Sequence, residues 1–223
     1  MNKPTFRYAA LLCLSLSVFS LQAWGQMRSG KLGIGASGSL YLFNSNVSDG
    51  LMKAGGGINL SYSATEYLGI RALLGVGQLG WKTPNKLSNT TTLTSGNLYL
   101  SYDMIPQGTF NPFLFVGGGV NYFDPKSDKG TYLGTNIVNF SKVALSGSGG
   151  VGFDYFFSEF FSATLSGEFV MCNTDKLDAQ SVTKNLGTNE SFTRVNLEFR
   201  YYFFDQDYVT KLIQALQERY KKR

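Results

Sequence analysis

Seven charged residues fall on the polar side of an alternating apolar and polar pattern. They are Arg71, Asp103, Asp154, Glu168, Arg194, Glu198 and Arg200. Such groups, brought together in one enclosed space, could either line an ion path or pair with one another and fill that space. Buried charges must be paired, and three cations against four anions are close to balance. We therefore favour a salt-bridge network, with Arg71 and Glu168 as one candidate pair.

Catalysis by a histidine is excluded, because the chain contains none. A serine nucleophile would lack its usual base. The carboxylates could do acid–base chemistry only beside a substrate pocket. We predict that the protein is not an enzyme.

Cofactor and metal motifs are present only as fragments. Segments 33–38 and 75–80 match the G-x-G-x-x-G pattern, but neither opens a helix, and the pattern binds a dinucleotide only at a helix N-terminus. Segment 124–130 offers two carboxylates for calcium, yet two interleaved lysines oppose a cation there. Cys172 is the only cysteine beyond residue 25, which excludes a cysteine-based zinc cluster. We expect no cofactor and no metal.

The elements that must position the charged residues are strands. Eight segments alternate between apolar and small polar residues with a period of two, as strand side chains do. They lie at 31–44, near 57–64, 68–81, near 97–104, 113–123, about 137–155, 161–171 and 192–203. Short turns and longer polar loops alternate between them, which is typical of outer-membrane barrels with periplasmic turns and outer loops.

The composition of the two faces predicts which one points outward. In each strand the non-apolar face consists of Gly, Ser, Thr and Asn with a few charges. An eight-stranded barrel has an interior only wide enough for side chains, so the small polar face fits inside and the apolar face meets lipid. We predict an all-β fold, an eight-stranded antiparallel transmembrane up-and-down β-barrel in the lipid of a Gram-negative outer membrane.

Aromatic residues gather near the strand ends, where membrane interfaces favour them. We expect two belts of lipid-facing rings. One, at the short turns, contains Tyr67, Phe110, Phe113, Tyr155, Phe156, Phe157, Phe160, Phe161, Tyr201 and Phe203; the other, at the loops, contains Phe43, Trp81, Tyr122, Phe123 and Phe169.

The leading segment 1–25 has the pattern of a secretory signal peptide. Lys3 and Arg7 precede an apolar run that ends in a small-x-small site at 23–25. The run is shorter than the roughly 20 apolar residues of a membrane-spanning helix. The barrel is then expected to occupy 26–204, where basic and acidic side chains are nearly equal in number, so no nucleic-acid groove is implied.

The pattern resembles the small outer-membrane β-barrel family that includes the OmpA transmembrane domain, OmpX and OmpW. In that family, aromatic residues at alternating positions of the last strand are the recognition signal for the barrel-assembly machinery. Phe199, Tyr201 and Phe203 match that pattern, so the resemblance implies that they are the assembly signal. The barrels of this architecture that are enzymes, a lipid A palmitoyltransferase and a deacylase, rely on a histidine.

Segment 205–223 departs from that family, because many members end at the last strand. Its apolar residues are spaced as one face of a helix: Val209, Leu212, Ile213, Leu216 and Tyr220. We expect a periplasmic amphipathic helix, which either docks on a periplasmic or secretion-complex protein or lies on the inner face of the outer membrane.

These patterns together predict a non-catalytic outer-membrane barrel with a structural or surface-interaction role. A narrow channel for ions or small hydrophobic molecules is the alternative, as the resemblance to OmpW suggests. The third possibility is an accessory subunit that docks a partner through the terminal helix.

Overall fold

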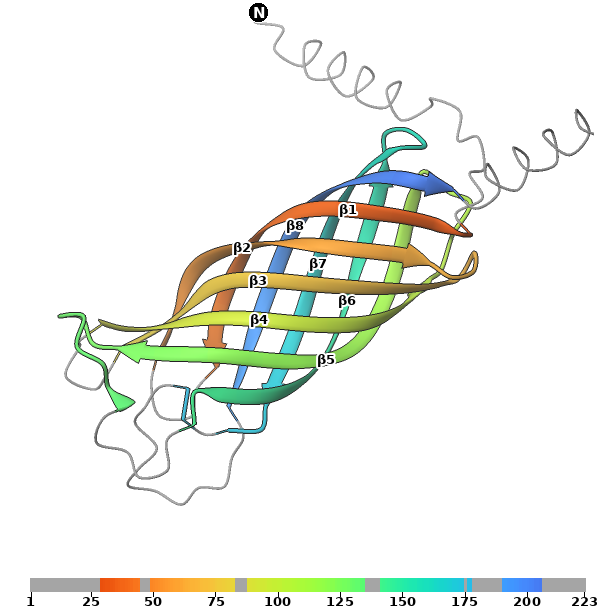
Figure 1. Ribbon diagram of the computed structural model, residues 1–223. Coiled ribbons are helices and arrows are strands. Elements are labelled where there is room, and N and C mark those ends of the chain that lie inside the picture. Colours follow the sequence, from red (N-terminus) through yellow and green to blue (C-terminus); the bar gives the residue numbers. More distant parts are fainter. Residues whose placement is uncertain are drawn as a thin grey trace, which may run out of the picture.

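The computed structural model describes residues 29–44, 49–82, 88–134, 141–174, 176–177 and 190–205, and within them it shows a closed barrel of eight antiparallel strands. The strands are β1 (Lys31–Asn44), β2 (Asp49–Ser63), β3 (Leu68–Lys82), β4 (Ser88–Asp103), β5 (Phe110–Lys126), β6 (Val143–Phe156), β7 (Phe161–Cys172) and β8 (Ser191–Asp205). Each strand pairs with the next in sequence, and β8 pairs with β1 to close the wall (Figure 1). The predicted eight-stranded up-and-down barrel is confirmed.

The apolar face points outward. On β1, Ile34 and Leu40 are 46% and 47% exposed, whereas Ser39 and Tyr41, which alternate with Leu40, are buried. The same alternation runs around the barrel, so a band of exposed leucine, valine, isoleucine and aromatic side chains covers the outside. Lipid is the solvent that suits such a surface, and a closed barrel pairs every backbone group along the span.

Glycine makes room for large side chains inside the narrow lumen. The ring of Tyr41 lies against Gly77, where a Cβ atom would come within 2.7 Å of the ring Cζ. A Cβ atom at Gly55 would approach the same ring to 2.6 Å. Tyr41 can therefore turn inward only because β2 and β3 carry no side chain at these two positions.

Strand ends differ from the sequence-based bounds. β2 and β4 begin about eight to ten residues earlier than the alternating pattern indicates, at Asp49 and Ser88. β6 begins at Val143, six residues after the predicted start, and β8 continues to Asp205. The loop halves of β2 and β4 were missed because glycine and threonine replace apolar residues there, which hides the period of two.

Two expected elements lie outside the described residues, namely the signal peptide at 1–25 and the helix residues from 206 onward, including Val209, Leu212, Ile213, Leu216 and Tyr220. No helix long enough and apolar enough to cross a membrane occurs in the described part of the chain.

The aromatic belts are partly wrong. Phe43, Trp81 and Phe123 are at most 2% exposed and point into the barrel, and so do Phe113 and Phe156 at the turn end. Each has the same parity along its strand as the polar lumen residues, so the pleat turns it inward. The other predicted turn-end rings face outward or are partly exposed, as are Tyr122 and Phe169 at the loop end.

A charge placed on the outer wall should destabilise the barrel according to its depth. Leu98 is 59% exposed near the middle of β4, whereas Thr90 lies close to the loop end of the same strand. Leu98→Arg should lower the free energy of unfolding by about 2–4 kcal/mol, and Thr90→Arg by about 0–1 kcal/mol. Urea unfolding in lipid vesicles measures both values, and equal losses would contradict the assignment of this face to lipid.

Candidate functional site

The lumen holds all seven charged residues singled out from the sequence. Arg71 comes from β3, Asp103 from β4, Asp154 from β6, Glu168 from β7, and Arg194, Glu198 and Arg200 from β8. Six of the seven are buried, and the guanidinium side chain of Arg71 is 14% exposed. We call this set the lumen ion-pair network.

The central pair of the network joins β7 and β8. Arg194 faces Glu168 directly across the strands, and its Nε donates to Glu168 Oε2 at 2.9 Å. Its terminal nitrogen also donates to the hydroxyl oxygen of Tyr99 at 2.6 Å. Both charged side chains are 1% exposed, so each neutralises a charge that has no access to water.

The turn-end part of the network gathers around Asp154. Arg71 donates to Asp154 at 2.9 Å, and its guanidinium lies 3.8 Å above the ring of Phe113. Arg200 lies 3.9 Å from the same carboxylate and donates through Nε to Glu198 at 2.7 Å. Asp154 therefore lies within ion-pair distance of two arginines from different strands, β3 and β8.

The predicted pair of Arg71 with Glu168 is wrong. Arg71 pairs with Asp154, with Asp103 at 3.9 Å as a second carboxylate, whereas Glu168 pairs with Arg194. The reason is register: Arg194 stands directly opposite Glu168 on the adjacent strand. The reach of Arg71 across the lumen decides its partner, and that distance is not encoded in strand periodicity.

Little open space remains between these side chains. A cavity of about 40 Å³ lies beside Arg71, Tyr99 and Glu168, and one of about 10 Å³ lies nearer the turns, beside Asp103 and Tyr202. Such volumes hold a few water molecules at most. In the described residues, no group of three or more His, Cys, Asp and Glu could hold a metal ion.

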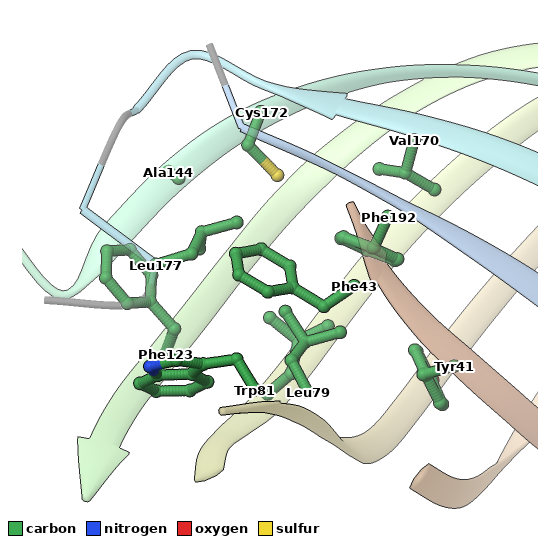
Figure 2. Packing of buried hydrophobic residues seen from close by; sticks show 11 residues of the cluster. Tyr41, Phe43, Leu79, Trp81, Phe123, Ala144, Val170, Cys172, Leu177 and Phe192 are labelled. Carbon is green, nitrogen blue, oxygen red and sulfur yellow. The ribbon is translucent and has the colours of Figure 1, made fainter. Parts of the chain in front are cut away.

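A second layer closes the loop end of the lumen. It is the loop-end cluster, an apolar group made of Tyr41, Phe43, Leu79, Trp81, Leu93, Phe123, Ala144, Val170, Cys172, Leu177 and Phe192 (Figure 2). Leu177 belongs to the segment between β7 and β8, and its carbonyl oxygen accepts a hydrogen bond from Thr91 at 2.6 Å. Its amide donates to the Glu190 carboxylate, so polar contacts hold this apolar side chain over the lumen.

Sequence reasoning missed the loop-end cluster, although a signal for it was present. Leu79 and Trp81 alternate on the inward side of β3, as Tyr41 and Phe43 do on β1. Two strands with large apolar residues at inward positions near the same end indicate a plug. The presence of aromatic residues on both faces there obscured the pattern.

The proposed assembly residues lie on the outer wall of the last strand. Phe199, Tyr201 and Phe203 are 60%, 42% and 54% exposed. The ring centroid of Tyr201 is 5.0 Å from that of Phe161 on β7 and 6.4 Å from that of Phe160. These rings therefore form part of a girdle at the turn end.

A closed barrel with an apolar outer band, a turn-end aromatic girdle and a filled lumen defines a small outer-membrane β-barrel protein. The family model for the outer membrane protein β-barrel domain matches residues 9–203 of the sequence, and the chain belongs to that family. The predicted family and the predicted outer-membrane location are confirmed.

Several solved structures are similar to this chain. Neisserial surface protein A is 15% identical, with a TM-score of 0.53 over 77% of this chain and 97% of that one. Ail of Yersinia pestis is 13% identical (TM-score 0.49, 78% and 99% covered), and OprG of Pseudomonas aeruginosa is 16% identical (TM-score 0.48, 81% and 99% covered). No curated protein matches the sequence. At 15% identity, the likeness to Neisserial surface protein A shows the fold alone.

Removing one member of the central pair should destabilise the barrel. Arg194→Met leaves the Glu168 carboxylate buried without its cation, so the free energy of unfolding should fall by about 3–5 kcal/mol. The double variant Arg194→Met/Glu168→Leu removes both charges and should recover most of that loss. Urea titration monitored by heat-modifiable gel migration measures both. A single variant as stable as the wild type would show that the pair contributes nothing.

Proposed function

We propose that the protein is a non-catalytic outer-membrane barrel with a structural role. The barrel is a rigid scaffold that carries its outer loops for surface interaction. The observation that carries the proposal is the double closure of the lumen. The loop-end cluster fills one half, and the lumen ion-pair network fills the other.

A filled lumen favours a scaffold over a transporter. The two cavities beside the lumen ion-pair network are too small for a solute larger than water. The carboxylates of the network are held by arginine and hydroxyl partners rather than aimed at an open pocket. The absence of histidine removes the commonest general base, which supports a non-catalytic role.

The length of the strands supports a role in presenting the outer loops at the cell surface. β2 to β5 are each 15 to 17 residues long, whereas a strand needs only about 9–11 residues to cross the hydrocarbon core. The longest strands, β4 and β5, have 16 and 17 residues, against 14 and 12 in β6 and β7, and their loop ends reach farther than those of β6 and β7 in Figure 1. Such strands carry their loops beyond the hydrocarbon core.

Planar-bilayer recording tests the closed-lumen proposal. The wild-type protein should give no discrete conductance steps. Trp81→Ala/Phe123→Ala should remain silent, because the ion-pair layer persists, and adding Arg194→Ala/Glu168→Ala should open a path. Heat-modifiable migration verifies that each variant folds. Discrete steps from the wild type that vanish on Arg71→Ala would instead establish a channel.

We further propose that Phe199, Tyr201 and Phe203 are read by the barrel-assembly machinery. The three rings share one outward face of the last strand, where a partner could reach them before the wall closes against β1.

Alanine variants separate this recognition from girdle packing. Tyr201→Ala/Phe203→Ala should slow assembly in cells, seen as unfolded protein in pulse-chase samples without heating. Phe161→Ala removes a neighbouring girdle ring from β7 and is the matched control. Equal delays in the two variants would contradict a specific role for the last strand.

A further inference from the structure

The outer wall of the barrel carries an apolar groove across β2 to β5. Its volume is about 530 Å³, and its lining includes Gly56, Leu74, Val76, Gly96, Val120 and Tyr122. Gly96 on β4 pairs with Leu74 on β3 and with Val120 on β5. The missing side chain between these larger residues creates the hollow, and Gly56 beside Val76 extends it.

The groove changes character toward the loops. On the outward face of β4, the residues from Gly96 toward the loop end are Thr94, Thr92 and Thr90. Thr94 pairs with Tyr122, Thr92 with Asp124, and Thr90 with Lys126. Between Gly96 and Thr90, about 20 Å of strand at roughly 3.3 Å per residue, the outer wall passes from apolar to hydroxyl-bearing to charged.

A cationic cluster stands at that charged end. The ammonium groups of Lys126 and Lys142 lie 3.2 and 2.9 Å from Asp124, so two cations share one carboxylate. The Lys142 ammonium also lies 4.3 Å from the ring centroid of Tyr132 and 5.9 Å from that of Tyr122, which lines the groove. The hydrogen bond to Asp124 raises the pKa of Lys142, so this exposed group stays charged at neutral pH. The cluster retains one net positive charge beside the groove.

We propose that this wall binds one outer-leaflet lipid, with an acyl chain in the groove and a phosphate-bearing headgroup against Lys126 and Lys142. The apolar floor suits a hydrocarbon chain, the threonine hydroxyls suit a polyhydroxylated or phosphorylated head, and the excess cation is complementary to its charge. A second copy of the barrel fits less well, because a two-fold contact across the groove would bring two cationic rims together.

Native mass spectrometry of the full protein in detergent tests the proposal. The probes are diphosphorylated lipid A, monophosphorylated lipid A and inorganic phosphate alone. The protein should retain one diphosphorylated lipid, bind the monophosphorylated form more weakly, and be unaffected by inorganic phosphate. Full displacement of the lipid by inorganic phosphate would show a simple anion site and overturn the proposal.

Filling the groove tests the acyl chain. A Cβ atom at Gly96 would meet only Leu74 Cδ2, at 3.4 Å, so Gly96→Leu fits the wall and occupies the hollow. Gly147 on β6 is the matched control, because it also faces outward, has nothing within 4 Å of a Cβ atom and does not line the groove. Lipid retention should fall in Gly96→Leu and stay unchanged in Gly147→Leu. Equal retention in both, or loss of a dimer instead of a lipid, would overturn the proposal.

Changing the cluster tests the headgroup with opposite signs. Lys126→Ala and Lys142→Ala should each weaken diphosphorylated lipid binding about fivefold, which corresponds to about 1 kcal/mol per lysine. Asp124→Asn removes the carboxylate that both lysines share and should strengthen binding. If the cluster were only structural, all three variants would weaken binding or none would, and either result contradicts the proposal.

Discussion

The small circumference of an eight-stranded barrel constrains every inward residue. The pleat sends half of each strand into a lumen that has room for side chains and little else. Each large group must therefore have a small neighbour, as Tyr41 has Gly55 and Gly77, and each charge must have a partner within reach. The polar face lies inside for a separate reason: the outer face must be apolar to meet lipid.

The lumen meets this constraint in two chemically different ways. Toward the loops, apolar side chains pack around Trp81 and Phe123 and exclude water. Toward the turns, arginines and carboxylates pair across the lumen, with Asp154 as a shared acceptor. Ion pairs lose strength if either partner moves, and apolar packing loses strength if a void opens. The lumen is thus filled by two layers that weaken under different perturbations.

The sequence predicts the architecture but not the contacts across the lumen. A period of two identifies the strands and their outer face, because lipid and lumen select opposite residue types. It does not place Arg71 opposite Asp154, since that contact spans strands β3 and β6 and depends on shear and side-chain reach. At the loop end the rule weakens further, because Leu42 and Phe43, or Tyr122 and Phe123, are apolar on both faces. Parity counted from the polar residues of the same strand separates them, and composition alone does not.

Glycine on the outer wall has a different structural role from glycine in the lumen. Gly38 faces Gly56 in register, and Gly118 faces Gly147. A Cβ atom at Gly56 or Gly118 would come within 2.8 Å of a backbone oxygen, so close approach explains those two. Gly38 and Gly147 have nothing within 4 Å, and glycine inside a strand costs about 0.5–1 kcal/mol relative to alanine. A wall of leucine would suit lipid equally well. Gly96 is a further position that sterics leave open, since a Cβ atom there would meet only Leu74 Cδ2 at 3.4 Å, and it lies in the groove where we place an acyl chain.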